Sequence, residues 1–314
     1  MDPCARSLWT EVQLKTLVDL FPIHSEAPKL LSDSEGLVFR FPEGLMAKAY
    51  PGDFRSRSEL LEEVEWVQKL AEKNLNVSRF LPFDNGEYVT EIPCSGAPFL
   101  ACKMIEVPGV HMNKATLSEN LESYARVWGQ TLAGLHKFGA NCLRDSIKPH
   151  WEEHRDFSKL HLIPQESRLL NAVEILRNRL SAMDSSREYG LIHADLHQGN
   201  FHLDEQGNIH IFDFDDMHQN WFLYDIAVIM EGIECGVFHD SAENVDRFLR
   251  VFLEGYDEIL PSPCMDELDL FRAYRKFTLL IYCIENHFHV SEKADDQESY
   301  QAYHKGLCEA MTGA

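Results

Sequence analysis

The chain has 314 residues, 45% of them hydrophobic and 25% charged, which is the composition of an ordinary globular protein long enough for one large domain or two lobes. Its net charge of −22 argues against binding to nucleic acid or to an anionic membrane surface, because both are bound by surplus lysine and arginine. The same charge can steer a cationic small molecule, such as an amine, toward the protein, although solubility alone is the favoured explanation for it.

The termini and cysteines bear on the compartment. The eight cysteines are scattered without a C-x-x-C pair, which indicates reduced thiols rather than a disulfide framework or a zinc site. The first residues lack the basic and apolar regions of a signal peptide, and no apolar run reaches about 18 residues. We therefore expect a soluble, cytoplasmic protein.

The first hundred residues predict a small sheet that carries a helix. A helix is expected to begin near Ser56, because Ser56 and Glu59 form an S-x-x-E capping box. The remaining elements expected in this region are a helix at 9–20, strands at 37–41 and 45–50 around a turn at 42–44, and strands at 86–92 and 99–105.

After Pro108-Gly109 the pattern becomes mainly helical. Thr116 and Glu119 form a second capping box, which predicts the start of a helix that runs to Phe138. Further helices are expected at 165–183, 241–259 and 266–290, with a strand-rich segment at 190–216 between them. The division expected is a sheet lobe at 1–103, a hinge at 104–109 and a helical lobe at 110–314.

Residues 191–216 carry the strongest chemical signal. Alternating apolar residues on both sides of a Gly207-Asn208 turn predict a β-hairpin. Asn200 stands at the start of its first strand and Asp213 at the end of its second, while Asp195 lies on the preceding loop. An amide oxygen and a carboxylate can hold a hard cation such as Mg²⁺, and a further carboxylate can accept a hydroxyl proton. These are the parts that phosphoryl transfer needs.

The spacing H-x-D-x-x-x-x-N, followed by D-x-D-D after the hairpin, resembles the aminoglycoside phosphotransferase/choline kinase-like phosphotransferase family. Asp225, in Tyr-Asp-Ile-Ala, fills the family's last acidic position. The resemblance implies a two-lobed, protein-kinase-like α+β fold, with a small sheet-plus-helix lobe and a mainly helical lobe. It also implies ATP, or GTP, and Mg²⁺ as cofactors.

The same resemblance implies residue roles in the catalytic segment. Asp195 would be the catalytic base, with His193 and Asp225 bracing its loop. Asn200 and Asp213 would be the Mg²⁺ ligands. Asp215 would contact the metal or substrate through water, and His197 would face the substrate.

Roles in nucleotide binding are implied for the sheet lobe. Lys48 occupies the strand of the family's phosphate-anchoring lysine, which pairs with a helix glutamate. Glu63 is slightly favoured as that partner by its helix face, and Glu59, Glu62 and Glu65 stay open. The connector that binds adenine would be the segment Met104-Ile105-Glu106-Val107.

Two departures separate the chain from protein kinases. The segment expected over the phosphates, Ser32-Asp33-Ser34-Glu35-Gly36, has no G-x-G-x-x-G pattern. The chain also lacks Asp-Phe-Gly and Ala-Pro-Glu, and Asp225 comes too soon for a long activation loop.

Several residues have plainer interpretations. His193, Asp195 and His197 alternate and could hold zinc on a strand, but Gly199 makes this segment a loop. His202 and His210 are better explained as cross-strand neighbours on the hairpin. Trp221, Phe222 and Tyr224 are expected in the core. A solvated helix face is favoured over an acceptor pocket for four polar residues near the C-terminus: Arg272, Arg275, Glu285 and His287.

The sequence thus predicts an ATP-dependent phosphotransferase whose acceptor is a hydroxyl of a small molecule, such as an aminoglycoside, choline or an amino alcohol. The alternatives are a compact Ser/Thr protein kinase of the same fold and a nucleotide-binding pseudokinase without turnover.

Overall fold

The structure is a computed structural model, which describes residues 7–21, 27–33, 36–141, 148–153, 155–163, 165, 167–185, 188–239, 241–287 and 291–312. Ser34 and Glu35, in the segment expected over the phosphates, lie outside these residues. Among the described residues, no helix is both long and apolar enough to cross a membrane.

The chain forms two compact units. Unit 1 comprises residues 1–111 and 201–215, and unit 2 comprises residues 112–200 and 216–314. Neither unit is continuous in sequence, because the hairpin segment 201–215 groups with the N-terminal unit rather than with the helices on either side of it.

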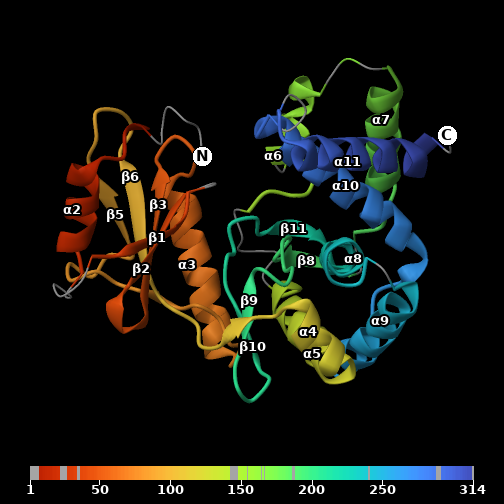
Figure 1. Cartoon of the computed structure of the whole chain (residues 1–314), viewed down its shortest axis with the longest axis horizontal. Coiled ribbons are helices and arrows are strands. Elements are labelled where there is room, and N and C mark those ends of the chain that lie inside the picture. The colour runs from red at the N-terminus through yellow and green to blue at the C-terminus, as the bar shows by residue number, and fades with distance from the viewer. Residues whose placement is uncertain are drawn as a thin grey trace. The chain divides into compact units, whose positions relative to one another are not determined.

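Unit 1 is built on an antiparallel sheet in the order β1-β2-β3-β6-β4, with β5 also paired to β6. Figure 1 labels β1, β2, β3, β5 and β6 of this sheet. Its strands are β1 (Lys29–Ser32), β2 (Leu37–Phe41), β3 (Leu45–Pro51), β4 (Phe80–Leu81), β5 (Val89–Ile92) and β6 (Phe99–Ile105). The helices of this unit are α2 (Glu11–Asp19) and α3 (Arg57–Glu72). Aromatic and aliphatic side chains share the core of this unit, with Trp9 edge-on to Phe99 and Phe21 stacked on Phe41.

Local sequence signals account for much of this unit. The turn between β2 and β3 lies at Pro42–Gly44 as expected, with Glu43 and Gly44 both at positive φ. The Ser56/Glu59 capping box at the start of α3 is confirmed. β4 and β1 were not expected from the sequence, because a two-residue strand and an exposed edge strand show too little periodicity.

The hairpin consists of β9 (Phe201–Leu203) and β10 (Ile209–Ile211), and β9 also pairs with β7 (Val110–His111). His202 lies directly opposite His210, which confirms the expected cross-strand pairing. Gly109 has φ +93°, and a Cβ there would stand 2.1 Å from the carbonyl oxygen of Leu203. Only glycine therefore allows the chain to approach β9 this closely.

Unit 2 is mainly helical. Its helices are α4 (Lys114–Glu119), α5 (Leu121–Gly139), α6 (Arg155–Ser158), α7 (Ser167–Ser181), α8 (Phe222–Glu231), α9 (Ala242–Asp257), α10 (Leu268–Glu285) and α11 (Ala294–Thr312). A two-stranded ribbon joins β8 (Tyr189–Ile192) to β11 (His218–Trp221). α5 packs on α9, and α10 packs on α8 and α11 (Figure 1).

Two expectations for unit 2 are corrected. Thr116 does not cap the long helix: it lies inside α4, which Asn113 caps, and α5 begins separately at Leu121. The pattern misled because Asn113 is itself a strong N-cap three residues earlier. The sequence also gave no prediction of α11, whose apolar stripe is weak. Trp221, Phe222 and Tyr224 are buried as expected.

Candidate active site

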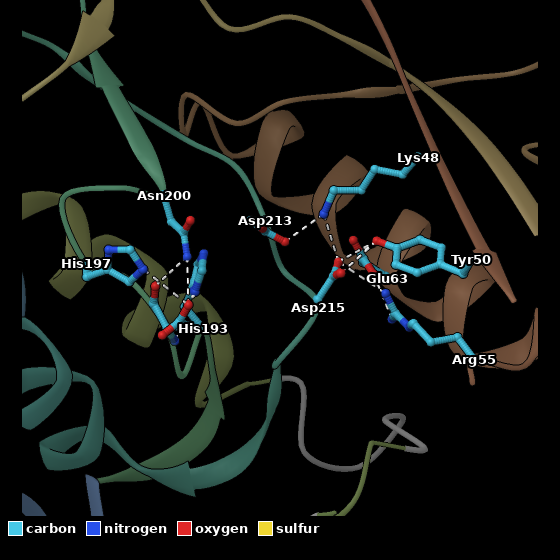
Figure 2. Close-up of polar contacts among 10 residues, drawn as sticks. Lys48, Tyr50, Arg55, Glu63, His193, His197, Asn200, Asp213 and Asp215 are labelled. Carbon is cyan, nitrogen blue, oxygen red and sulfur yellow. Dashed lines mark hydrogen bonds and ion pairs between the residues drawn. The ribbon is translucent and has the colours of Figure 1, made fainter. Parts of the chain in front are cut away.

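Lys48 lies in the middle of β3, between strand neighbours Val38 on β2 and Cys102 on β6. Its side chain is only 10% exposed, and Nζ donates to Asp213 Oδ1 at 2.6 Å and to Asp215 Oδ1 at 3.0 Å (Figure 2). Burial lowers the pKa of Lys48, but the two carboxylates outweigh it and hold that pKa well above its ordinary value. Unit 1 thus presents a buried, permanently charged ammonium group.

Asp215 is the centre of a second set of contacts in unit 1. It accepts a hydrogen bond from Tyr50 Oη at 2.7 Å and pairs with Arg55 Nη1 at 3.2 Å, in addition to Lys48. Burial raises the pKa of Asp215, but Lys48 and Arg55 lower it further, to well below the usual range. With three donors around it, this carboxylate fixes the orientation of the lysine and of the strand end.

The glutamates of α3 have different partners. Glu63 is the buried one, 2% exposed, and pairs with Arg55 Nη2 at 2.8 Å. Glu59 caps the helix at Ser56, and Glu65 pairs with Lys69 on the surface. In this structure Glu63 is therefore linked to Lys48 through Arg55 and Asp215, because the two Nη atoms of Arg55 reach both carboxylates. Nothing in the sequence singled out Arg55 or Tyr50.

In unit 2, the loop after β8 is held by Asp225 in the first turn of α8. This fully buried carboxylate accepts from the backbone N–H of Ala194 at 2.6 Å and of His193 at 3.1 Å. Ala194 has φ +68°, a left-handed conformation that is costly for a residue with a Cβ. The two hydrogen bonds offset that cost and place the residue after it, Asp195.

His136 on α5 completes the support of Asp225. Its Nε2 lies 3.0 Å from Asp225 Oδ2, and its Nδ1 lies 2.7 Å from Tyr256 Oη. An ionised carboxylate can only accept, so Nε2 carries the proton and Nδ1 accepts from the tyrosine. Sequence reasoning missed both residues, although a histidine on the apolar stripe of the helix at 116–138 was the available signal.

Asp195 is surrounded by donors from its own loop and from α10. Oδ2 accepts from Asn200 Nδ2 at 2.8 Å and faces His197 Nε2 at 3.4 Å (Figure 2). Oδ1 accepts from Arg275 Nη2 at 2.7 Å. His197 Nδ1 accepts from the N–H of Gly199, so its proton is on Nε2. Burial raises the pKa of Asp195, but Arg275 and His197 together hold it below the usual range. Asp195 is therefore a carboxylate, able to accept a proton.

Arg275 corrects the expectation of a solvated helix face. Its side chain is 13% exposed and its guanidinium is directed to Asp195. Arg272, one turn earlier, pairs with Glu234 and Asp269, and Glu285 pairs with Lys159. The helical pattern could not reveal the pair with Asp195, because the two residues are 80 positions apart.

The connector residues have structural contacts. Met104 is buried in β6 opposite Met46 and Phe80. The N–H of Glu106 donates to Gly44 O at 2.7 Å, and its carboxylate pairs with Arg40. Their role toward adenine remains a prediction.

The residues expected to bind magnesium have suitable donor atoms. Asn200 directs Nδ2 to Asp195, both to its carboxylate and to its backbone oxygen, which leaves the amide oxygen as the atom for a cation. Asp213, at φ +68° after β10, has a 38% exposed side chain. Oxygen donors suit Mg²⁺ or Ca²⁺, and two protein ligands suffice where phosphate and water supply the rest. Within the described part of the chain, no group of three His, Cys, Asp or Glu side chains could hold a metal ion, so the zinc alternative has no ligand set there.

Comparison with known proteins identifies the family. Residues 29–271 match the family model of the phosphotransferase enzyme family. The chain belongs to that family. This confirms the resemblance drawn from the H-x-D-x-x-x-x-N segment.

Among curated relatives, amicoumacin kinase of Bacillus subtilis (strain 168) is 30% identical over 213 residues, which are 65% of this chain and 62% of the kinase. An uncharacterized protein of Synechocystis is 23% identical, over 69% of this chain and 60% of its own length. The chain thus spans less than two thirds of these relatives.

Solved structures of small-molecule kinases confirm the fold. Amicoumacin kinase hAmiN in complex with AMP-PNP, Ca²⁺ and Ami superimposes with a TM-score of 0.90 at 23% identity, covering 98% of this chain and 96% of that one. A microcompartment-associated aminopropanol kinase gives a TM-score of 0.75 at 20% identity, over 94% of each chain. The predicted kinase-like α+β fold is therefore correct.

Proposed function

We propose that this protein is an ATP-dependent kinase that phosphorylates a hydroxyl group of a small molecule. The observation that carries the proposal is the Asp195 carboxylate, held ionised on a strained loop by Asn200, His197 and Arg275. An oriented carboxylate at this place in a phosphotransferase fold is what a hydroxyl acceptor needs.

In this proposal Asp195 accepts the proton of the acceptor hydroxyl. The acceptor oxygen forms the new bond to the γ-phosphorus, the bond from that phosphorus to the β,γ-bridging oxygen breaks, and ADP leaves with that oxygen. His193 and Asp225 keep the Asp195 loop in place, as their hydrogen bonds indicate.

For the nucleotide, we propose that Lys48 binds phosphate oxygens and that Asn200 and Asp213 ligate Mg²⁺. The metal, when bound, neutralises charge on the phosphates. Asp213 and Asp215 place the ammonium group of Lys48 before ATP arrives. The segment 104–107, with Met104 and Glu106, is proposed to contact the base, in a hinge at 104–109 between lobes at 1–103 and 110–314.

For the acceptor, we propose an amine-bearing alcohol. Two relatives are named as kinases of amicoumacin and aminopropanol, and the net charge of −22 favours a cationic compound. Amicoumacin is the first compound to test. His197, 36% exposed beside Asp195, is the residue that we propose to contact it.

The test is an ADP-release assay with Mg·ATP over a panel of amicoumacin, 1-amino-2-propanol, choline and an aminoglycoside. Asp195→Asn should lower kcat by about 10³-fold or more while nucleotide affinity changes little. Asp269→Asn, on a 94% exposed side chain, is the matched control and should keep full activity. Equal activity of wild type and Asp195→Asn would remove the proposed base.

Two other outcomes would point elsewhere. If a test peptide is phosphorylated and none of the alcohols is, the protein would be a protein kinase. Tight nucleotide binding without transfer or hydrolysis would indicate a pseudokinase.

A further inference from the structure

The two oxygens of Asp195 are used unequally. Oδ2 accepts from Asn200 and faces the N–H of His197, whereas Oδ1 accepts from Arg275. Among the described residues, Arg275 is the donor to Oδ1. A carboxylate oxygen has two lone pairs, so Oδ1 can accept one more hydrogen bond. Under the proposed function, Oδ1 is thus the atom that receives the hydroxyl proton, and Arg275 is its neighbour.

Arg275 is firmly placed on α10. Thr278 Oγ1 donates to the backbone oxygen of Arg275 at 2.9 Å, and Tyr224 Oη lies 3.1 Å from the same hydroxyl. Burial lowers the pKa of Arg275, but Asp195 and Tyr224 raise it, so the guanidinium is always charged. The cation therefore stays beside Oδ1 at any working pH.

The ion pair between Arg275 and Asp195 is expected to add little to the stability of the fold. Both side chains are largely buried. Buried pairs often stabilise no more than apolar residues of the same size. Its position on the proposed base gives it a different use.

We propose that Arg275 is a positioning residue for phosphoryl transfer: its guanidinium fixes Oδ1 of Asp195 in the orientation that receives the acceptor hydroxyl. The inference rests on the proposed function. Without Arg275, only contacts to Oδ2 remain, and the carboxylate can rotate away from the hydroxyl. Turnover should then fall while nucleotide binding, which we assign to Lys48, is unaffected.

The experiment compares Arg275→Gln, Arg275→Lys and Arg272→Gln, using the panel alcohol with the highest turnover. Arg272 is the matched control, because it is on the same helix but pairs with Glu234 instead. Arg275→Gln should lower kcat about 10- to 100-fold, with KM and the affinity for Mg·AMP-PNP within about 2-fold. Arg275→Lys keeps the charge, so its kcat should be at least about 3-fold higher than that of Arg275→Gln.

The melting temperature of each variant shows whether it is folded. If Arg275→Gln does not fold, Arg275→Lys alone tests the role of Arg275, because this variant should fold and still have a lower kcat than the wild type. The role of Arg275 alone is overturned if a folded Arg275 variant keeps the wild-type kcat. It is also overturned if Arg272→Gln loses as much kcat as Arg275→Gln. A wild type that transfers phosphate to no alcohol overturns the proposed function and this inference with it.

Discussion

Three of the four aspartates to which the resemblance gives roles show how the surroundings of a carboxylate set what it does. Asp225 is wholly buried and satisfies backbone N–H groups, so it supports a loop. Asp215 is surrounded by Lys48, Tyr50 and Arg55, so it orients a cation. Asp195 keeps 22% of its side chain exposed, more than either of the other two. Their roles in catalysis remain predictions.

His136 leads to a prediction about pH. Burial lowers the pKa of His136 below its ordinary value of 6.5, although Asp225 raises it in part. The folded protein therefore keeps His136 neutral, while the unfolded chain takes up a proton below about pH 6.5. Since the unfolded state then binds more protons, this group makes the free energy of unfolding fall as the pH falls, by at most about 1.4 kcal/mol per pH unit.

Urea unfolding of wild type and His136→Gln between pH 7.5 and 5 measures this effect. Glutamine can donate to Asp225 and accept from Tyr256, so the variant should fold and show a flatter pH dependence. Parallel curves for the two proteins would contradict the assignment.

At the scale of elements, glycines decide how closely helices pack. A Cβ on Gly129 of α5 would stand 2.0 Å from Phe252 O, and one on Gly255 of α9 would stand 2.2 Å from Arg126 O. Each helix thus needs a glycine where the backbone of the other passes. The sequence shows both residues, but nothing in it says which backbone atoms each of them meets.

Gly129→Ala should lower the free energy of unfolding by about 2–3 kcal/mol, because the helices must separate to admit the methyl group. Gly306→Ala on α11 is the matched control, since its methyl group would meet only the flexible side chain of Lys276. There the gain in helix propensity should stabilise the protein by up to about 1 kcal/mol. Urea unfolding of both variants checks the opposite signs, and a loss of similar size in both would contradict the packing argument.

At the scale of the whole molecule, charge is the dominant feature. With 51 acidic against 29 basic side chains, the folded chain repels itself more than its expanded form does. In the ion pairs of Lys48 and Arg275, by contrast, a buried cation attracts the carboxylate beside it.

Salt should therefore stabilise the protein. Raising NaCl from 0.01 to 0.15 M shortens the screening length from about 30 to about 8 Å, which weakens the long-range repulsion. We expect the melting temperature to rise over this range, with most of the change at the low end. A melting temperature that falls with salt would mean that attractive surface pairs outweigh the repulsion.

The sequence by itself determined the family, the kinase-like fold, the hairpin with His202 opposite His210, and the elements marked by caps and regular periodicity. These depend on residues close together in the chain, where spacing alone carries the information. Even there, Thr116 misled, because Asn113 competed for the same helix start.

Only the tertiary structure decided which side chains meet. Arg275 reaches Asp195 across 80 residues, Lys48 reaches Asp213 across 165, and Glu63 pairs with Arg55 rather than directly with Lys48. The grouping of 201–215 with the N-terminal unit was decided in the same way. Periodicity tells which face of an element is buried. A contact between distant residues depends instead on how the elements pack, and no local spacing in the sequence encodes that packing.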